Sequence, residues 1–179
     1  LFYNDALITI FSFGGIIANG VYGFGLEKML TFGIILGIAA GVGSFIMGYI
    51  DDYIGPKKMI QISNFLLLIA TIIVVFVNSE TFFWIAGVLV GFASGPNQSS
   101  SRSLMSKLCP KGKENEFFGF FAFSGKITAF LGPFLLAQVT MLSLKYFDLS
   151  SVQAQRYGVS VVLMLLIVGS INLYFVKED

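Results

Sequence analysis

The side chains able to do chemistry are the few polar and ionisable residues that interrupt long apolar runs. A charge near the centre of a bilayer costs about 2.5 to 3.5 kcal/mol on insertion scales, so it usually faces a protein interior or a water-filled cavity. Residues placed in this way are able to bind a polar solute or a coupling ion. The candidates for the wall of such a cavity are Asn4, Asp5, Asn97, Gln98, Arg102 and Lys126.

Lys126 is the deepest of the basic candidates. It follows Glu116 by about 15 Å along a helix at about 1.5 Å per residue, which is too far for the ammonium to reach the nearer membrane surface easily. One interpretation is a fixed charge pair or hydrogen-bonded lysine, with Asp5 as the partner by charge. The other is that Lys126 receives a substrate carboxylate or exchanges its ion-pair partner. Both interpretations require Lys126 to face the interior of the protein.

The stretch GPNQSSSRS at 95–103 follows an apolar run and predicts a break in a helix. Pro96 removes a backbone donor and Gly95 weakens the helix beside it. Carbonyl groups freed at such a break can bind a ligand where they line a cavity. Alternatively, the stretch is a kink followed by a helix end at the headgroups, with the Arg102 side chain extended toward water.

Several kinds of chemistry are excluded by composition. Histidine is absent and Cys109 is the only cysteine, so disulfides, Cys/His metal sites and histidine catalysis are not expected. A net charge of +1 argues against a nucleic-acid partner. An intramembrane hydrolase with Asp5 as acid or base and a nearby serine as nucleophile lacks a histidine partner. No P-loop motif is present, and we expect neither an enzyme nor a cofactor.

The elements that position these residues are expected to be transmembrane helices. The sequence is 56% hydrophobic and 12% charged, about half the charged fraction of a soluble domain. Runs of about 20 apolar residues match the hydrocarbon core of a bilayer. We therefore predict an all-α membrane protein with six spans: Leu1 to Val21, Met29 to Ile50, Met59 to Val77, Phe82 to Ser103, Phe117 to Leu142 and Tyr157 to Val176.

The basic residues of the links predict which way the spans point. Excess Lys and Arg mark cytoplasmic links. The links after spans 2 and 4, with the C-terminus, hold six such residues, and the other links hold three. The two sets are Lys57, Lys58, Lys107, Lys111, Lys113 and Lys177, against Lys28, Lys145 and Arg156. Both termini are therefore predicted to be cytoplasmic, and the start at Leu1 to be the middle of a longer chain.

The distribution of charge also predicts which spans face lipid. Spans 3 and 6 carry no charged side chain, so we expect them to face lipid, while spans 1, 4 and 5 surround a wet space. Two glycine trios at four-residue spacing, Gly33/Gly37/Gly41 and Gly87/Gly91/Gly95, each share a helix face. Such faces let helices approach closely, so both trios are predicted to pack against neighbouring helices.

The loop GYIDDYIGPKK at 48–58 fits the pattern G-x-x-x-D-R/K-x-G-x-R/K-R/K of the major facilitator superfamily. The matching residues are Gly48, Asp52, Gly55, Lys57 and Lys58, while Tyr53 stands where a basic residue is usual. Glycines permit a tight turn, lysines favour anionic headgroups, and an aspartate suits a helix N-terminus. The resemblance implies a cytoplasmic gating motif, with a partner for Asp52 in the other half of the transporter.

A second resemblance covers 98–133, QSSSRSLMSKLCPKGKENEFFGFFAFSGKITAFLGP. It is similar to the signature of the unknown-major-facilitator family, relatives of the autophagy-related vacuolar amino-acid effluxers. The matching residues are Gln98, Ser101, Arg102, Ser103, Pro110, Glu116, Phe117, Phe118, Gly119, Gly125, Lys126, Gly132 and Pro133. FYNDALITI near the start resembles the seventh helix of the same family.

The two resemblances imply that residues 1–179 are helices 7 to 12, one half of a twelve-helix major facilitator fold. The N-terminal bundle would be missing, and with the bilayer and a small-molecule solute it would be the partner. The implied function is secondary transport of a small polar solute by alternating access, an amino acid being one candidate, in a bacterial inner membrane. The alternative is a non-transporting receptor or scaffold on the same fold.

Overall fold

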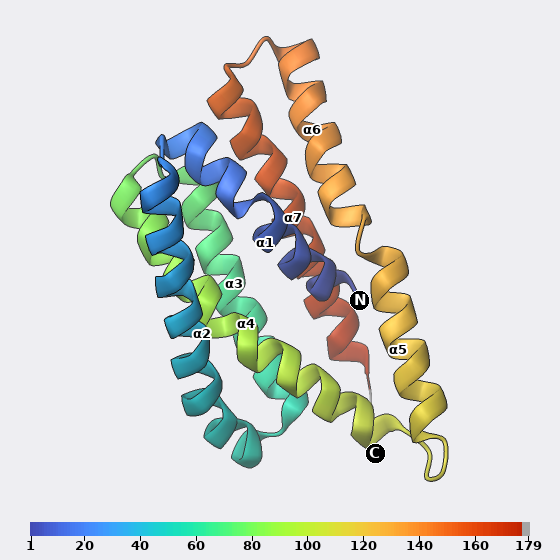
Figure 1. Ribbon diagram of the computed structural model, residues 1–179. Coiled ribbons are helices and arrows are strands. Elements are labelled where there is room, and N and C mark those ends of the chain that lie inside the picture. Colours follow the sequence, from blue (N-terminus) through green and yellow to red (C-terminus); the bar gives the residue numbers. More distant parts are fainter. Residues whose placement is uncertain (177–179) are drawn as a thin grey trace.

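The computed structural model describes residues 1–176 and is helical throughout, without a strand in that range. The helices are α1 (Phe2–Tyr22), α2 (Leu26–Ile54), α3 (Pro56–Phe76), α4 (Glu80–Leu108), α5 (Glu114–Thr128), α6 (Leu131–Phe147) and α7 (Ser151–Phe175). Figure 1 shows α2 along one side of the bundle and α5 with α6 along the other. The prediction of an all-helical chain is confirmed.

Five helical stretches of the described chain are long and apolar enough to cross a membrane: α1, α2, α3, the stretch Glu114–Phe147 and α7. The predicted count of six is not confirmed, because α4 is not among them. This helix has 29 residues, but its second half carries the polar run that begins at Asn97. Lys177, which was counted in the charge tally, lies outside the described residues.

The helix ends follow local sequence signals. Gly23 ends α1 in the left-handed conformation, where its N–H bonds to the carbonyl of Asn19. Gly55 joins α2 to α3 with φ of 85°, a conformation that residues with a side chain rarely adopt. Pro56 then occupies the first turn of α3, where no N–H is needed. The motif at 48–58, called the motif loop below, therefore has Gly55 as its single residue between α2 and α3.

That spans 3 and 6 face lipid stays a prediction, although α3 and α7 are more buried by protein than the other membrane-capable stretches, and both keep exposed apolar side chains such as Phe65 and Ile167. In α3 and α7, 39% and 44% of the most apolar stretch is buried, against 6% in α2. α3 packs on α4, α7 and α2, while α7 packs on α1, α6 and α3. A helix that is apolar all round can be buried by protein as well as by lipid. The uncharged stretches of these two helices therefore have helix neighbours on several sides.

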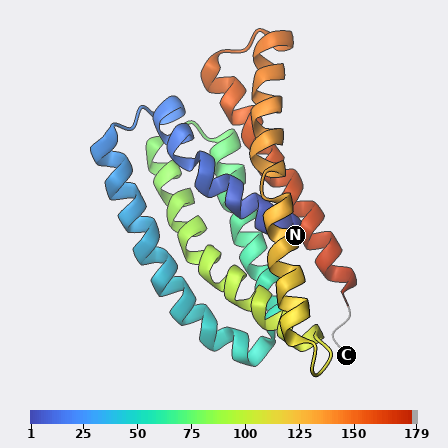
Figure 2. The same cartoon turned by 45° about the vertical axis from the view of Figure 1, so that its right-hand side comes forward.

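A continuous hydrophobic core joins α3 and α7 to α1 and α4. Its fully buried members include Ala6 on α1, Leu67 and Ala70 on α3, Ala93 on α4 and Leu166 on α7. Figures 1 and 2 both place the N-terminus beside α5, partway along the length of the bundle. The first turns of α1 therefore lie at mid-depth, between α7 on one side and α5 on the other.

The predicted break at Gly95 and Pro96 is wrong, because α4 continues through both residues. The proline leaves the carbonyl of Phe92 without its usual partner four residues on. Gly43 of α2 lies directly against that carbonyl, at a distance that leaves no room for a Cβ atom. α2 therefore packs directly on the carbonyl that Pro96 leaves without a donor.

The chain breaks instead in the predicted fifth span, which is divided into α5 and α6 at Ala129 and Phe130. Pro133 follows Ala129 by four residues, so it cannot donate to the Ala129 carbonyl and its ring crowds that carbonyl. Phe134 donates to Phe130 at 2.9 Å and starts the new helix. The second Gly-Pro pair, Gly132 and Pro133, thus interrupts a helix where the first pair does not.

One glycine trio packs as predicted and the other does not. A Cβ at Gly87, Gly91 or Gly95 would meet α2, so the close approach of α2 and α4 is confirmed. For Gly33, Gly37 and Gly41 there is nothing within 4 Å of a built Cβ, so the predicted packing of this trio is wrong. The α2 trio faces open space, and Gly33 and Gly37 line a cavity that is described below.

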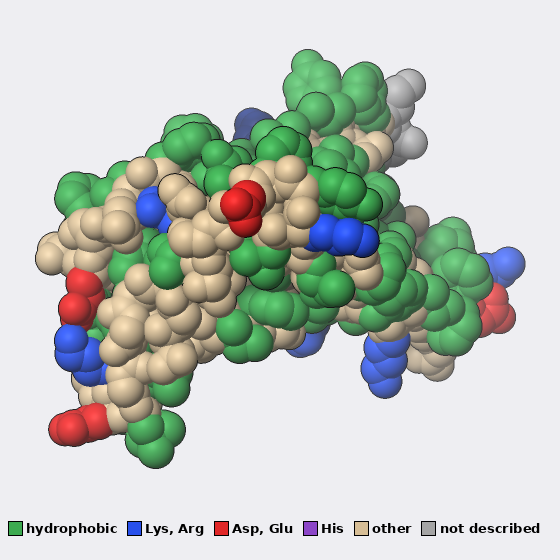
Figure 3. All heavy atoms as spheres, turned by 90° about the horizontal axis from the view of Figure 1, so that it is seen from above, with side chains coloured by type: hydrophobic (Ala, Val, Ile, Leu, Met, Phe, Trp, Pro, Cys, Tyr) green, Lys and Arg blue, Asp and Glu red, His purple; other side chains and the backbone are tan. Residues whose placement is uncertain are grey.

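The end of the bundle where α1 meets α2 and α6 meets α7 mixes apolar, polar and charged groups. Figure 3 looks onto this end and shows hydrophobic side chains at its edges, polar and backbone atoms between them, and several charged side chains. An aromatic cluster of Tyr22, Phe24, Phe32, Phe83 and Trp84 lies here. Aromatic side chains of this kind gather at membrane–water interfaces.

Candidate functional site

Asp5 is the most deeply buried charged candidate, with 1% of its surface exposed. The hydroxyl of Thr128 on α5 bonds to Asp5 Oδ1 at 2.9 Å, while Asp5 Oδ2 is buried and has no partner. Thr128 is the last residue of α5 before the interruption, so this contact ties α1 to the point where the fifth span breaks. Asp5 was predicted as a site residue, whereas no sequence signal pointed to Thr128 as its partner.

A pocket of about 260 Å³ lies beside this contact, between α1, α4 and α5. Asn4 lines it from α1 and Lys126 from α5. The remaining lining residues are Leu1, Tyr3, Ile8, Ser101, Phe121, Ala122, Gly125 and Ala129. Two of the six predicted site residues therefore share one pocket, and an amide faces it together with an ammonium group.

Lys126 does not form the predicted charge pair with Asp5. Among residues 1–176, the ion pair within 4 Å is Lys28 with Glu80, at 2.8 Å. Asp5 lies inside the packed region with Thr128, whereas Lys126 is exposed and opens toward the pocket. Residues 126 and 128 point to different sides of α5, which separates the two charges. The ammonium is therefore free to meet a ligand or water in the pocket.

Asn97 is buried and holds helices together. Its Nδ2 donates to Asn64 Oδ1 on α3 at 2.7 Å, and Asn64 Nδ2 donates to Ser170 Oγ on α7 at 3.1 Å. The hydroxyl of Ser101 donates to the Asn97 carbonyl at 2.6 Å, so the hydroxyl of Tyr3, 3.0 Å from Ser101 Oγ, is left to act as donor there. This network joins α1, α3, α4 and α7, and it lies behind the pocket wall.

Gln98 and Arg102 do not join the same pocket. Both side chains are exposed, and neither lines the pocket that holds Asn4 and Lys126. They lie on the outward face of the second half of α4, whereas Asn97 and Ser101 turn inward. The polar run of α4 is thus divided between a buried face that bonds to other helices and a face open to solvent, lipid or another chain.

The motif loop is attached to the end of α7. Lys57 Nζ donates to the carbonyl of Tyr174 at 3.0 Å and to that of Val176. A cation at the carbonyl end of a helix is favourable because the helix dipole is negative there. Gly48, Asp52 and Lys58 are exposed. The lysine expected at lipid headgroups therefore caps a helix, and the predicted partner of Asp52 stays a prediction.

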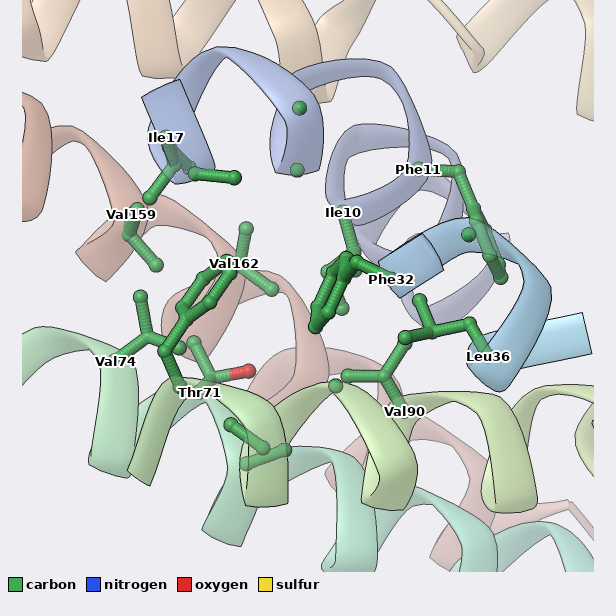
Figure 4. A pocket seen from close by; sticks show the side chains of 18 of the residues that line it. Ile10, Phe11, Ile17, Phe32, Leu36, Thr71, Val74, Val90, Val159 and Val162 are labelled. Carbon is green, nitrogen blue, oxygen red and sulfur yellow. The ribbon is translucent and has the colours of Figure 1, made fainter. Parts of the chain in front are cut away.

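A second cavity, of about 380 Å³, was not predicted. It lies between α1, α2, α3, α4 and α7, and Figure 4 shows Ile10, Phe32 and Val162 pointing into it. Thr9 and Thr71 are its polar lining side chains, and both donate to carbonyls of their own helices. The cavity therefore suits an apolar group. The unpacked glycines of α2, Gly33 and Gly37, were the available signal in the sequence.

Comparison with known proteins gives consistent results. Residues 1–179 match the family described as Vacuole effluxer Atg22 like. The chain is 30% identical to the uncharacterized MFS-type transporter YxiO of Bacillus subtilis (strain 168) over 178 residues, covering 99% of this chain and 39% of that protein. No solved structure matches it.

Fungal relatives are similar at lower identity. Autophagy-related protein 22 of Cryptococcus neoformans (strain JEC21) is 26% identical over 94% of this chain and 31% of its own length. Autophagy-related protein 22 of Candida glabrata is 28% identical over 76% of this chain and 27% of its own length. The chain therefore spans about two fifths or less of these relatives.

Proposed function

Because the chain belongs to the Atg22-like vacuole effluxer family, we propose that it is part of a secondary transporter for a small polar solute. The relatives are named as an MFS-type transporter and as autophagy-related proteins, and the chain is a multi-pass membrane protein. An amino acid is the solute class proposed, moved by alternating access between this bundle and an N-terminal bundle.

The pocket that holds Lys126 and Asn4 carries this proposal. An ammonium group that faces a pocket without a carboxylate partner can receive the carboxylate of an amino acid, and the Asn4 amide can add a hydrogen bond. The apolar cavity shares no lining residue with this pocket and is not assigned to solute binding. Arg102 and Gln98 lie outside this pocket and are not assigned to solute binding.

The test is flux of labelled amino acids into liposomes that contain the full-length protein. Lys126→Met is expected to weaken solute uptake, while folded yield stays close to that of the unchanged protein. Lys126→Arg keeps the positive charge and should retain part of the uptake. Lys145→Met, an exposed lysine on α6, is the matched control and should leave uptake unchanged.

Two outcomes would contradict the assignment. Loss of folded yield with Lys126→Met, but normal uptake per folded molecule, would make Lys126 a structural residue. Absence of flux for a broad set of solutes, with intact binding of one of them, would favour the receptor or scaffold alternative.

We propose that the motif loop and the loop at 109–113 face the cytoplasm of a bacterium. Cys109 can test this once any cysteine outside residues 1–179 is replaced. Partial desolvation and the Glu114 carboxylate raise the pKa of the Cys109 thiol, so labelling should be done at mildly alkaline pH. An impermeant maleimide should label Cys109 in inside-out vesicles and not in intact cells. The reverse labelling would invert the topology.

A further inference from the structure

Asp5 is a buried carboxyl group without a cation. It is 1% exposed, forms no ion pair within residues 1–176, and leaves Oδ2 with no hydrogen-bond partner. An ionised carboxylate accepts hydrogen bonds at both oxygens and is costly to bury when they are not supplied. A group in this setting takes up a proton instead of staying charged.

Hydrogen-bond accounting at Thr128 points the same way. The Thr128 hydroxyl lies 2.9 Å from Asp5 Oδ1 and 3.1 Å from the carbonyl oxygen of Ser124, yet it has one proton to donate. If Asp5 is ionised, both acceptors compete for that proton. If Asp5 is a carboxylic acid, its own O–H donates to Thr128 Oγ1, and the Thr128 proton satisfies Ser124. The neutral form completes the chain of donors.

The charges of the surrounding helices do not neutralise Asp5. α5 presents Lys126 and α4 presents Arg102, but both side chains are exposed and neither bonds to Asp5. Tyr3 on α1 bonds to Ser101. α6 and α7 present glycine and apolar side chains. The α-amino group of Leu1 is one helical turn earlier, and in a chain that continues upstream that nitrogen is an uncharged amide.

A pocket that can hold water lies next to this pair, although neither residue lines it. Asn4 and Ala129 line the 260 Å³ pocket, and they are the sequence neighbours of Asp5 and Thr128. The pocket is large enough for several waters at about 30 Å³ each. Contact between α1 and α5 is sparse compared with that between α1 and α7, so the Asp5–Thr128 bond can part without dismantling the core.

We propose that Asp5 is a proton-binding site, a carboxylic acid while it is joined to Thr128 and a carboxylate after it releases the proton to water in the pocket. The O–H bond of Asp5 breaks, the electron pair stays on the carboxylate, and water in the pocket carries the proton away. The proton is then the ion coupled to solute movement. This last step rests on the proposed transport function, whereas the proton site itself does not.

The proton site can be tested without a solute. The infrared spectrum of the full-length protein in liposomes at neutral pH should contain the C=O stretch of a protonated carboxyl group. Asp5→Asn should abolish this band, while Asp52→Asn, a change in the exposed motif loop, should leave it. A spectrum without this band, or with the band unchanged in Asp5→Asn, would overturn the proposal.

A second variant covers the case in which Asp5→Asn fails to fold. Thr128→Val removes the acceptor of the Asp5 O–H, so the band should shift to higher frequency, and Thr128→Ser should restore it. If the band had the same frequency in the unchanged protein, in Thr128→Val and in Thr128→Ser, Asp5 would not be bonded to Thr128 as a carboxylic acid.

Coupling needs a separate measurement in the same liposomes. A gradient of mixed neutral amino acids should change the internal pH, read with a trapped dye, and Asp5→Asn should remove the pH change. Solute flux that follows Na⁺ and not pH would overturn proton coupling. An Asp5 band without any solute flux would leave the proton site standing and contradict the proposed function.

Discussion

Replacing Gly43 by alanine tests whether α2 is held against the carbonyl that Pro96 releases in α4. Gly43 is buried, and a Cβ built on it overlaps the Phe92 carbonyl oxygen and lies 2.7 Å from Phe92 Cα. These are helix backbone atoms, so a change of rotamer cannot relieve the contact. One added methyl group must push α2 and α4 apart.

The size of the effect follows from two opposing terms. Overfilling a packed core costs about 1 to 3 kcal/mol, and the upper end is expected here because backbone meets backbone. Alanine recovers up to about 1 kcal/mol relative to glycine inside a helix. The net destabilisation is therefore about 2 kcal/mol, or about 30-fold in the ratio of folded to unfolded protein, since 1.4 kcal/mol is tenfold.

Gly41→Ala is the matched control on the same helix. A Cβ at Gly41 meets nothing within 4 Å, so this change keeps the gain in helix propensity without the clash. Thermal unfolding of the full-length protein in detergent should rank Gly41→Ala at or above the unchanged protein and Gly43→Ala clearly below it. Equal melting temperatures for the two variants would refute the reasoning about the covered carbonyl.

Two further changes test other contacts. Asn97→Ala leaves buried Asn64 Oδ1 without its donor and is expected to cost about 1 to 3 kcal/mol in thermal unfolding. Gln98→Ala, at an exposed position, should stay within about 0.5 kcal/mol, and equal effects would contradict the network. Lys57→Met removes the cation that caps α7, so amides in the last turn of α7 should exchange faster. Lys58→Met should leave their exchange unchanged, and similar rates for both lysine variants would contradict the capping role.

Helix type and turn chemistry were predictable because they depend on local sequence. Apolar runs of about 20 residues predicted where most helices lie, and the loop at 48–58 predicted a turn that needs Gly55. Breaks were not predictable in the same way. Pro96 and Pro133 each remove one backbone donor, yet one helix continues and the other stops. The two sites differ in what packs around them, as with Gly43 of α2 against Phe92, and one sequence does not reveal such packing.

The absence of charge in a span was a poor guide to how deeply that span is buried by other helices. The uncharged stretches of α3 and α7 are the most buried of the membrane-capable stretches, while the exposed glycine face that holds Gly37 belongs to α2. The polar run of α4 was likewise treated as one feature. Its helical geometry directs Asn97 inward and Gln98 outward, so adjacent residues have different roles. Sequence gives the candidates, and only the packing assigns each one to a face.

Asp5 and Lys126 illustrate why pairing by charge failed. One of the two interpretations paired Lys126 with Asp5 because their charges are opposite. The structure places them on different sides of α5, with Thr128 on Asp5 and the pocket at Lys126. Lys126 faces a pocket that admits water or an anion, whereas Asp5 is buried without a cation and is proposed to be a neutral acid. Because the two groups are not paired with each other, Asp5 can release its proton and Lys126 can exchange its partner separately, whereas a locked ion pair would first have to break.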